Sequence, residues 1–323
     1  MGSIASTRWA EWMMAVGGGA VVMGGTLLLL MAPDGPGLPS ASLRDPAGLL
    51  MVTGGVLAAL GGVVTLCGLA LYVLTPAFSR DGSALRDYGS HRVVLACTAL
   101  AAVVGNALAA IYFLALPHMV PGASGLRDLS GSRVLSPEGI VVAATSLDIA
   151  LLAVAYVRVV RPGAISWQEM GIRRGQLMRG FAIGLPFGVL LFLVSTMLEL
   201  LLHLAGVRQT QGAMFQSVAR ASTRQFLMVL LAGAAVAPAA EEIFFRGYVF
   251  RAYLRQKGVV RAYLFSAGLF ALVHLDMAAL LPIFVVGLLL SFLYHRTGSV
   301  LPGMVAHGFN NALAFTLLYL GLG

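Results

Sequence analysis

The 323-residue chain carries too few charges for a soluble domain, since 59% of its residues are hydrophobic and only 11% are charged, against about a quarter in soluble proteins. The net charge of +8 rests almost wholly on arginine, and these arginines flank apolar runs. This distribution argues against a nucleic-acid partner and favours retention at the cytoplasmic face of a membrane. Cys67 and Cys97 lie inside apolar runs and indicate neither a disulfide framework nor a metal cluster.

Apolar runs recur along the whole chain, each long enough to cross a hydrocarbon core about 30 Å thick. We predict nine membrane-spanning helices, at residues 10–31, 48–74, 93–116, 140–157, 181–204, 226–250, 261–275, 278–294 and 301–320. The first run is followed by no clear cleavage site and is expected to be retained. The predicted fold class is therefore all-α, a polytopic helical bundle in the membrane, with the lipid bilayer as its surroundings.

The connecting segments carry loop signals, with prolines at residues 33–39 and 121–137. Residues 158–179 contain Trp167, Ile172 and five arginines, which indicates a short amphipathic helix on the membrane surface. The chain thus divides into three parts: a four-span region of no assigned role (1–160), an amphipathic connector with one span and a loop (161–225), and a C-terminal core (226–320).

The basic residues favour one orientation. With the N-terminus in the cytoplasm, fourteen arginines and lysines fall on the cytoplasmic side and six on the outer side, while Arg246 lies within a span. This bias predicts a cytoplasmic N-terminus and an external C-terminus. The arginine-, alanine- and glycine-rich composition is typical of a bacterial protein, so we expect the bacterial inner (cell) membrane.

Span 226–250 contains ionisable residues that cost about 2.5–3.5 kcal/mol each to insert, which makes them candidates for function. Glu241 and Glu242 are adjacent and so leave the helix about 100° apart. Glu242 and Arg246 are spaced four residues apart, which suits an ion pair. That pairing leaves Glu241 free on another face for chemistry. The alternative is that the triplet only packs helices together.

Two further spans supply polar groups. His274 follows Phe270 by four residues, and His307 precedes Asn311 by four, so that each pair lies on one helix face. A lone histidine in a span is most often a helix contact. At 1.5 Å of rise per residue, however, these groups reach depths that overlap with that of Glu241, and the coincidence indicates one site.

These residue types suit the hydrolysis of an amide. Glu241 would take a proton from water while His274 holds that water from the other side, and His307 and Asn311 would donate hydrogen bonds to the developing oxyanion. The same atoms allow a second arrangement, in which His274, His307 and Glu241 bind a divalent metal such as zinc. The helical zinc motif His-Glu-x-x-His is absent. We therefore favour a site without a cofactor and leave the metal as the alternative.

The three motifs are Glu-Glu-x-x-x-Arg at 241–246, Phe-x-x-x-His at 270–274 and His-x-x-x-Asn at 307–311. Together they resemble the CPBP family, the group of CAAX prenyl protease-like and bacteriocin-processing-like membrane proteins also called Abi or Rce1-like. The resemblance covers about residues 226–318 and implies an all-helical intramembrane endopeptidase, of glutamic type or a metalloprotease. It implies catalytic roles for Glu241, His274, His307 and Asn311, and supporting roles for Glu242, Arg246 and Phe270.

Two rival functions stay open. One is a non-proteolytic scaffold, such as a bacteriocin self-immunity or regulatory factor of the same family. The other is a transporter with Glu241 as proton carrier, which should show paired, interrupted spans that the sequence does not display. For the protease, the expected partner is a membrane-associated protein or peptide. Among other polar residues in spans, Glu199 and His203 are expected to form a helix-end pair, and Asp148 and Asn106 to form interhelical hydrogen bonds.

Overall fold

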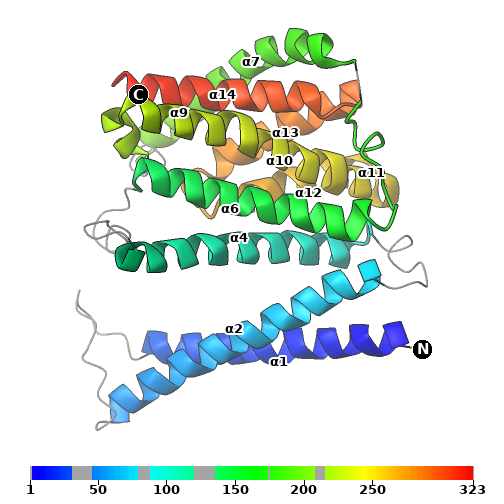
Figure 1. Ribbon diagram of the computed structural model, residues 1–323, viewed down its shortest axis with the longest axis vertical. Helices are drawn as coiled ribbons and strands as arrows, with labels where there is room; N and C mark the ends of the chain where they lie inside the picture. Colours follow the sequence, from blue (N-terminus) through cyan, green and yellow to red (C-terminus); the bar gives the residue numbers. More distant parts are fainter. Residues whose placement is uncertain are drawn as a thin grey trace. The chain divides into compact units, whose positions relative to one another are not determined.

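The computed structural model describes residues 2–30, 46–78, 88–119, 135–173, 175–207 and 215–322. The connector predicted at 33–39 and most of that at 121–137 lie outside these residues. The described segments form helices and turns without a strand, which confirms the all-α fold class. The chain divides into two compact units, Met1–Ala84 and Leu85–Gly323, which are coloured from blue to red in chain order in Figure 1.

The first unit consists of α1 (Gly2–Leu30) and α2 (Pro46–Phe78), which pack against each other. Glycines let the two backbones approach closely. A Cβ at Gly61 would lie 2.7 Å from the carbonyl oxygen of Gly17, and a Cβ at Gly68 would lie 2.9 Å from that of Ala10. Small residues at such contacts are typical of helix pairs in membranes, where packing replaces the hydrophobic effect.

The second unit contains the remaining elements. They are α4 (His91–Met119), α6 (Pro137–Ala155), η1 (Tyr156–Val160), α7 (Leu177–Leu204), η2 (Gln216–Arg220), α9 (Thr223–Leu231), η3 (Ala232–Val236), α10 (Ala237–Glu241), η4 (Glu242–Phe250), α11 (Arg251–Lys257), α12 (Val259–Leu272), α13 (Leu280–Thr297) and α14 (Leu301–Tyr319). The elements from α9 to α11 follow one another without a break and form one long helix. The helices α4 and α6, which the sequence analysis grouped with the N-terminal region, belong to this unit.

Local sequence explains where the helices of this unit begin and end. Ser222 caps the long helix, because its side chain accepts a hydrogen bond from the backbone N–H of Gln225 while the Gln225 side chain accepts one from the backbone of Ser222. Gly258, at a φ of 85°, ends that helix, and Gly298, at a φ of 63°, ends α13. Both backbone conformations favour glycine.

The connector before α7 differs from the prediction. Its described residues form turns rather than a short amphipathic helix. The reason is that Gly163, Gly171 and Gly175 take positive φ angles, of 77°, 95° and 78°, which interrupt a right-handed helix.

Helix α14, drawn in red in Figure 1, packs against α7 along a face of glycines. Gly180, Gly184 and Gly188 recur every four residues and meet side chains or backbone of α14. A Cβ at Gly184 would lie 2.6 Å from Cβ of Val305. This close approach fixes the position of α14, which carries two of the predicted site residues.

Six helices of the described chain are long and apolar enough to cross a membrane: Val56–Thr75, His91–Phe113, Pro137–Val160, Leu177–Leu204, Thr223–Lys257 and Leu280–Thr297. The chain is thus a multi-pass integral membrane protein. Helices also lie at the other three predicted spans, as α1, α12 and α14. Among these, α12 is a shorter apolar helix.

Candidate active site

The long helix is widened just before Glu241. The N–H of Ala237 bonds to the carbonyl of Ala232, five residues back, instead of four. The next bond with this five-residue spacing would run from residue 238 to the carbonyl of Gly233, but residue 238 is a proline and has no N–H. The carbonyl of Gly233 is therefore left for another donor, and the side chain of Asn311 on α14 supplies it, with Nδ2 2.8 Å from the oxygen. Widened turns of this kind are frequent at functional sites.

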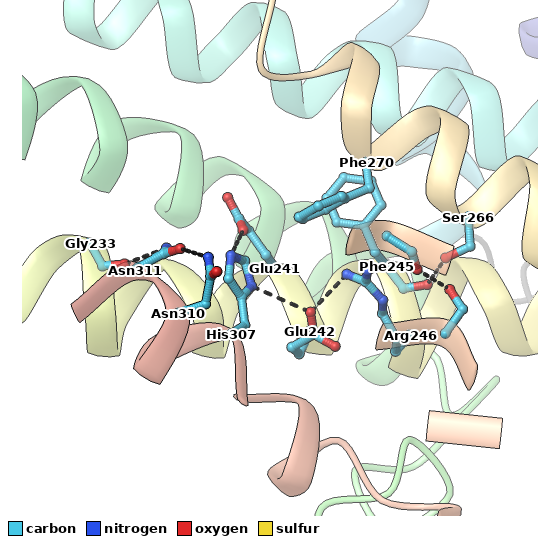
Figure 2. Close-up of polar contacts among 12 residues, drawn as sticks. Gly233, Glu241, Glu242, Phe245, Arg246, Ser266, Phe270, His307, Asn310 and Asn311 are labelled. Carbon is cyan, nitrogen blue, oxygen red and sulfur yellow. Dashed lines mark hydrogen bonds and ion pairs between the residues drawn. The ribbon is translucent and has the colours of Figure 1, made fainter. Parts of the chain in front are cut away.

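Glu242 and Arg246 form a buried ion pair, as the spacing predicted. Arg246 Nη1 lies 2.7 Å from Glu242 Oε1, and both side chains are fully buried. The guanidinium also donates through Nη2 to the carbonyl of Gly287 on α13, at 3.1 Å, and its carbon lies 4.5 Å from the ring centroid of Phe270 on α12. The pair thereby ties three helices together (Figure 2).

Gly303 allows α14 to pass over this ion pair. A Cβ at this position would lie 2.7 Å from Glu242 Oε2. The absence of a side chain at residue 303 thus makes room for the carboxylate.

Glu241 faces two histidines, and its side chain is only 8% exposed. His307 Nε2 lies 3.7 Å from Oε2 of this glutamate, and His274 Nε2 lies 3.9 Å from Oε1. The other ring nitrogen of His307, Nδ1, lies 3.6 Å from Glu242 Oε1. His307 therefore sits between the two carboxylates, as Figure 2 shows. The three predicted residues Glu241, His274 and His307 come together from three helical segments.

His274 has a defined orientation just beyond the end of α12. Its Nδ1 lies 2.7 Å from the carbonyl oxygen of Phe270. Because a carbonyl only accepts, Nδ1 is the donor of this bond, and Nε2 is the ring nitrogen that faces Glu241. The ring of Phe270 packs edge-on against both His274 and His307. Phe270 thus supports the site through both its backbone and its ring.

The site is most open at His274, whose side chain is 27% exposed, compared with 6% for His307. Two of the three residues that follow it are apolar and exposed: Leu275, with a φ of 53°, at 72% and Met277 at 78%. Asp276 lies between them and is half-buried.

Asn311 uses both ends of its amide in contacts between elements. Its Nδ2 bonds to Gly233, and its Oδ1 accepts a hydrogen bond from Asn310 Nδ2 at 3.0 Å. Its role toward an oxyanion stays a prediction.

Whether the site could hold a metal ion depends on the side chains that could act as its ligands. Among the residues that the structure describes, no group of three His, Cys, Asp or Glu side chains is arranged to hold a metal ion. Glu241, His274 and His307 converge without forming such a group, and the reaction proposed below does not use one.

Two residues near the site have a place that the sequence did not predict, Asn310 and Asp148. Asp148 and Asn106 were both expected to form interhelical hydrogen bonds. Asn106 is instead exposed and bonds to the carbonyl of Ala102 in its own helix. Asp148 is buried on α6, which packs against α10, the helix that ends at Glu241. In the sequence, the one sign that Asp148 could matter is that it is a charged residue within the apolar run of α6.

Comparison with known proteins finds a family model that matches the part of the chain that carries this site. Residues 222–313 match the family model "Rce1-like: Type II CAAX prenyl endopeptidase Rce1-like". The matched segment starts at the cap of the long helix and contains every predicted site residue, so the resemblance drawn from the three motifs is confirmed. The match indicates an endopeptidase and leaves residues 1–221 outside it. No curated protein and no solved structure matches the chain.

Proposed function

We propose that this protein is an intramembrane endopeptidase in which Glu241 activates water to hydrolyse a peptide bond of a membrane-associated protein or peptide. The observation that supports this most is the convergence of two histidine Nε2 atoms on the two oxygens of one buried carboxylate, at 3.7 and 3.9 Å. The Rce1-like match over the same residues supports the reaction class.

The distance between Glu241 and His274 suits a bridging water. At 3.9 Å, Oε1 and Nε2 are too far apart for a direct hydrogen bond. A water about 2.8 Å from each atom would fit between them. It would donate one proton to the carboxylate and the other to the lone pair of His274 Nε2, which orients its oxygen for attack.

The proposed reaction balances with these groups alone. The water oxygen forms a bond to the carbonyl carbon of the substrate, and Glu241 takes the released proton. His307 and Asn311 would donate hydrogen bonds to the oxyanion that develops. Glu241 then gives its proton to the amide nitrogen as the carbon–nitrogen bond breaks, which leaves a carboxylic acid and an amine.

The direct test is Glu241→Gln, which keeps the shape of the side chain and removes the base. The purified protein would be assayed on one apolar peptide sequence in two forms, with a free and with a farnesylated cysteine near the C-terminus. We expect cleavage to fall by a factor of about 10²–10⁴, the usual contribution of general-base catalysis. Glu199→Gln on α7, outside the matched segment, is the matched control and should cleave as the wild type does.

Three outcomes separate the alternatives. Full cleavage by Glu241→Gln would sink the proposal. Loss of cleavage in the presence of a chelator, restored by zinc, would replace it with the metalloprotease. A cellular phenotype that survives Glu241→Gln, together with a wild-type protein that cleaves neither peptide, would favour the scaffold.

A further inference from the structure

A chain of three hydrogen bonds runs through Asn310 across three helices. Ser195 Oγ on α7 donates to Asn310 Oδ1 at 3.5 Å. Asn310 Nδ2 donates to Asn311 Oδ1 at 3.0 Å, and Asn311 Nδ2 donates to the carbonyl of Gly233 at 2.8 Å. Figure 2 shows Asn310 between His307 and Asn311, on the side of Asn311 that faces away from Gly233.

The directions of these bonds are fixed by chemistry. The Gly233 carbonyl only accepts, so the amino end of Asn311 must face it. The carbonyl end of Asn311 then needs a donor, and Asn310 provides one. An amide nitrogen carries two hydrogens, and the bond to Gly233 uses one of them. The second hydrogen of Asn311 Nδ2 is left to point elsewhere.

The far end of this chain is its weakest part. Ser195 has one hydroxyl proton, which is shared between the carbonyl of Phe192 at 3.1 Å and Asn310 at 3.5 Å. Asn310 is therefore held mainly by its own bond to Asn311 and by its place on α14. The orientation of Asn311 depends on Asn310 more than on Ser195.

We propose that Asn310 is a positioning residue that holds the amide of Asn311 with one N–H on the Gly233 carbonyl and the second N–H available to the reaction. The inference rests on the proposed function, in which Asn311 donates to the oxyanion. Without the donor of Asn310, the Asn311 carbonyl end has lost its partner, and of the two bonds described above the amide keeps only the one to Gly233, which holds it less firmly in the orientation that the reaction needs. The effect should appear in the chemical step and not in substrate binding.

The test compares Asn310→Leu, which keeps the size of the side chain and removes its donor, with the wild type on the farnesylated peptide. We expect kcat to fall roughly five- to tenfold, the size of one net hydrogen bond, with KM unchanged. Asn310→Gln, which restores a donor one methylene further out, should recover part of the loss. Ser195→Ala is the matched control and should change kcat less than twofold.

A double-mutant cycle separates positioning from general packing. If Asn310 acts through Asn311, then Asn311→Ala and the double variant Asn310→Leu/Asn311→Ala should have the same kcat. Losses that multiply would overturn the inference, and so would an unchanged kcat in Asn310→Leu. If Asn310→Leu does not purify as a folded protein, Asn310→Ala carries the same test, because it also removes the donor without adding a charge.

The failure of the inference can be told from that of the proposed function. If Glu241→Gln loses cleavage and Asn310→Leu keeps full kcat, only the role of Asn310 falls. If Glu241→Gln cleaves normally, the proposed function falls and the role of Asn310 with it.

Discussion

Two adjacent glutamates have different surroundings in this protein. Glu242 is paired with Arg246 at 2.7 Å, whereas Glu241 faces two histidine nitrogens at longer range. The difference arises because neighbouring residues on a helix point in different directions. The same residue type therefore serves as a structural ion-pair partner at one position and as the proposed base at the next.

Removal of Arg246 should destabilise the protein strongly. Arg246→Met leaves the fully buried charge of Glu242 without its cation, and breaking a buried pair in this way costs about 3–5 kcal/mol. The melting temperature in detergent should fall clearly below that of the wild type. Arg296→Met, which removes an exposed arginine of α13, is the control and should melt near the wild-type temperature. Equal melting of the two variants would contradict a stabilising role for the pair.

Gly303 should not tolerate even one methyl group. In Gly303→Ala, the new Cβ would lie 2.7 Å from Glu242 Oε2, and overpacking of this kind costs about 1–3 kcal/mol. Both the melting temperature and the cleavage rate should decrease. Gly268→Ala on α12 is the matched control, since its Cβ would meet nothing within 4 Å, and it should be as stable as the wild type or more so. Equal behaviour of the two would argue that α14 can shift freely.

At the scale of helices, much of the architecture follows from the sequence. The apolar runs placed a helix at all nine predicted positions, and the i, i+4 spacing predicted the pair of Glu242 and Arg246. Helical rise alone put Glu241, His274 and His307 at overlapping depths, and the structure brings them together. These predictions succeeded because each depends only on distance along one helix.

Features that depend on contacts between helices could not be predicted in the same way. The bond from Asn311 to Gly233 requires the widened turn before Pro238, and no periodic pattern marks that turn. The burial of Asp148 depends on how α6 is rotated against the helices that pack on it, which include α10. Residues 158–179 were expected from their composition to include a short amphipathic helix, while the glycines before α7 impose turns.

The glycine face of α7 should control the site from a distance. Gly184→Val would push against Val305, since even a Cβ there would lie 2.6 Å from Val305 Cβ. We expect α14 to move and to carry His307 away from Glu241, so that cleavage falls at least tenfold while the protein still inserts in membranes. Ala182→Val, two residues away on the exposed face of α7, should retain wild-type cleavage. Normal cleavage by Gly184→Val would show that the position of α14 does not depend on this contact.

For the whole molecule, the arginine distribution predicts opposite locations for the two ends. If all nine helices cross the membrane, a cytoplasmic N-terminus places the C-terminus outside. Two variants would be made without Cys67 and Cys97, one with a single cysteine at the N-terminus and one with a single cysteine at the C-terminus. Each would be treated in intact cells with a membrane-impermeant maleimide. We expect labelling only at the C-terminal end. Labelling of neither end would indicate an even number of crossings and would place both ends in the cytoplasm.

The unequal exposure of the two histidines has a consequence for selectivity. His274 is the most exposed residue of the site and is followed by the apolar, exposed Leu275 and Met277, while Glu241 and His307 are buried. If substrates enter past these apolar side chains, we expect selectivity to depend first on the depth of the scissile bond in the bilayer. The amino-acid sequence of the substrate would matter less. The position of cleavage would then depend on the thickness of the lipid bilayer, and thinner or thicker bilayers would change which bond is cut.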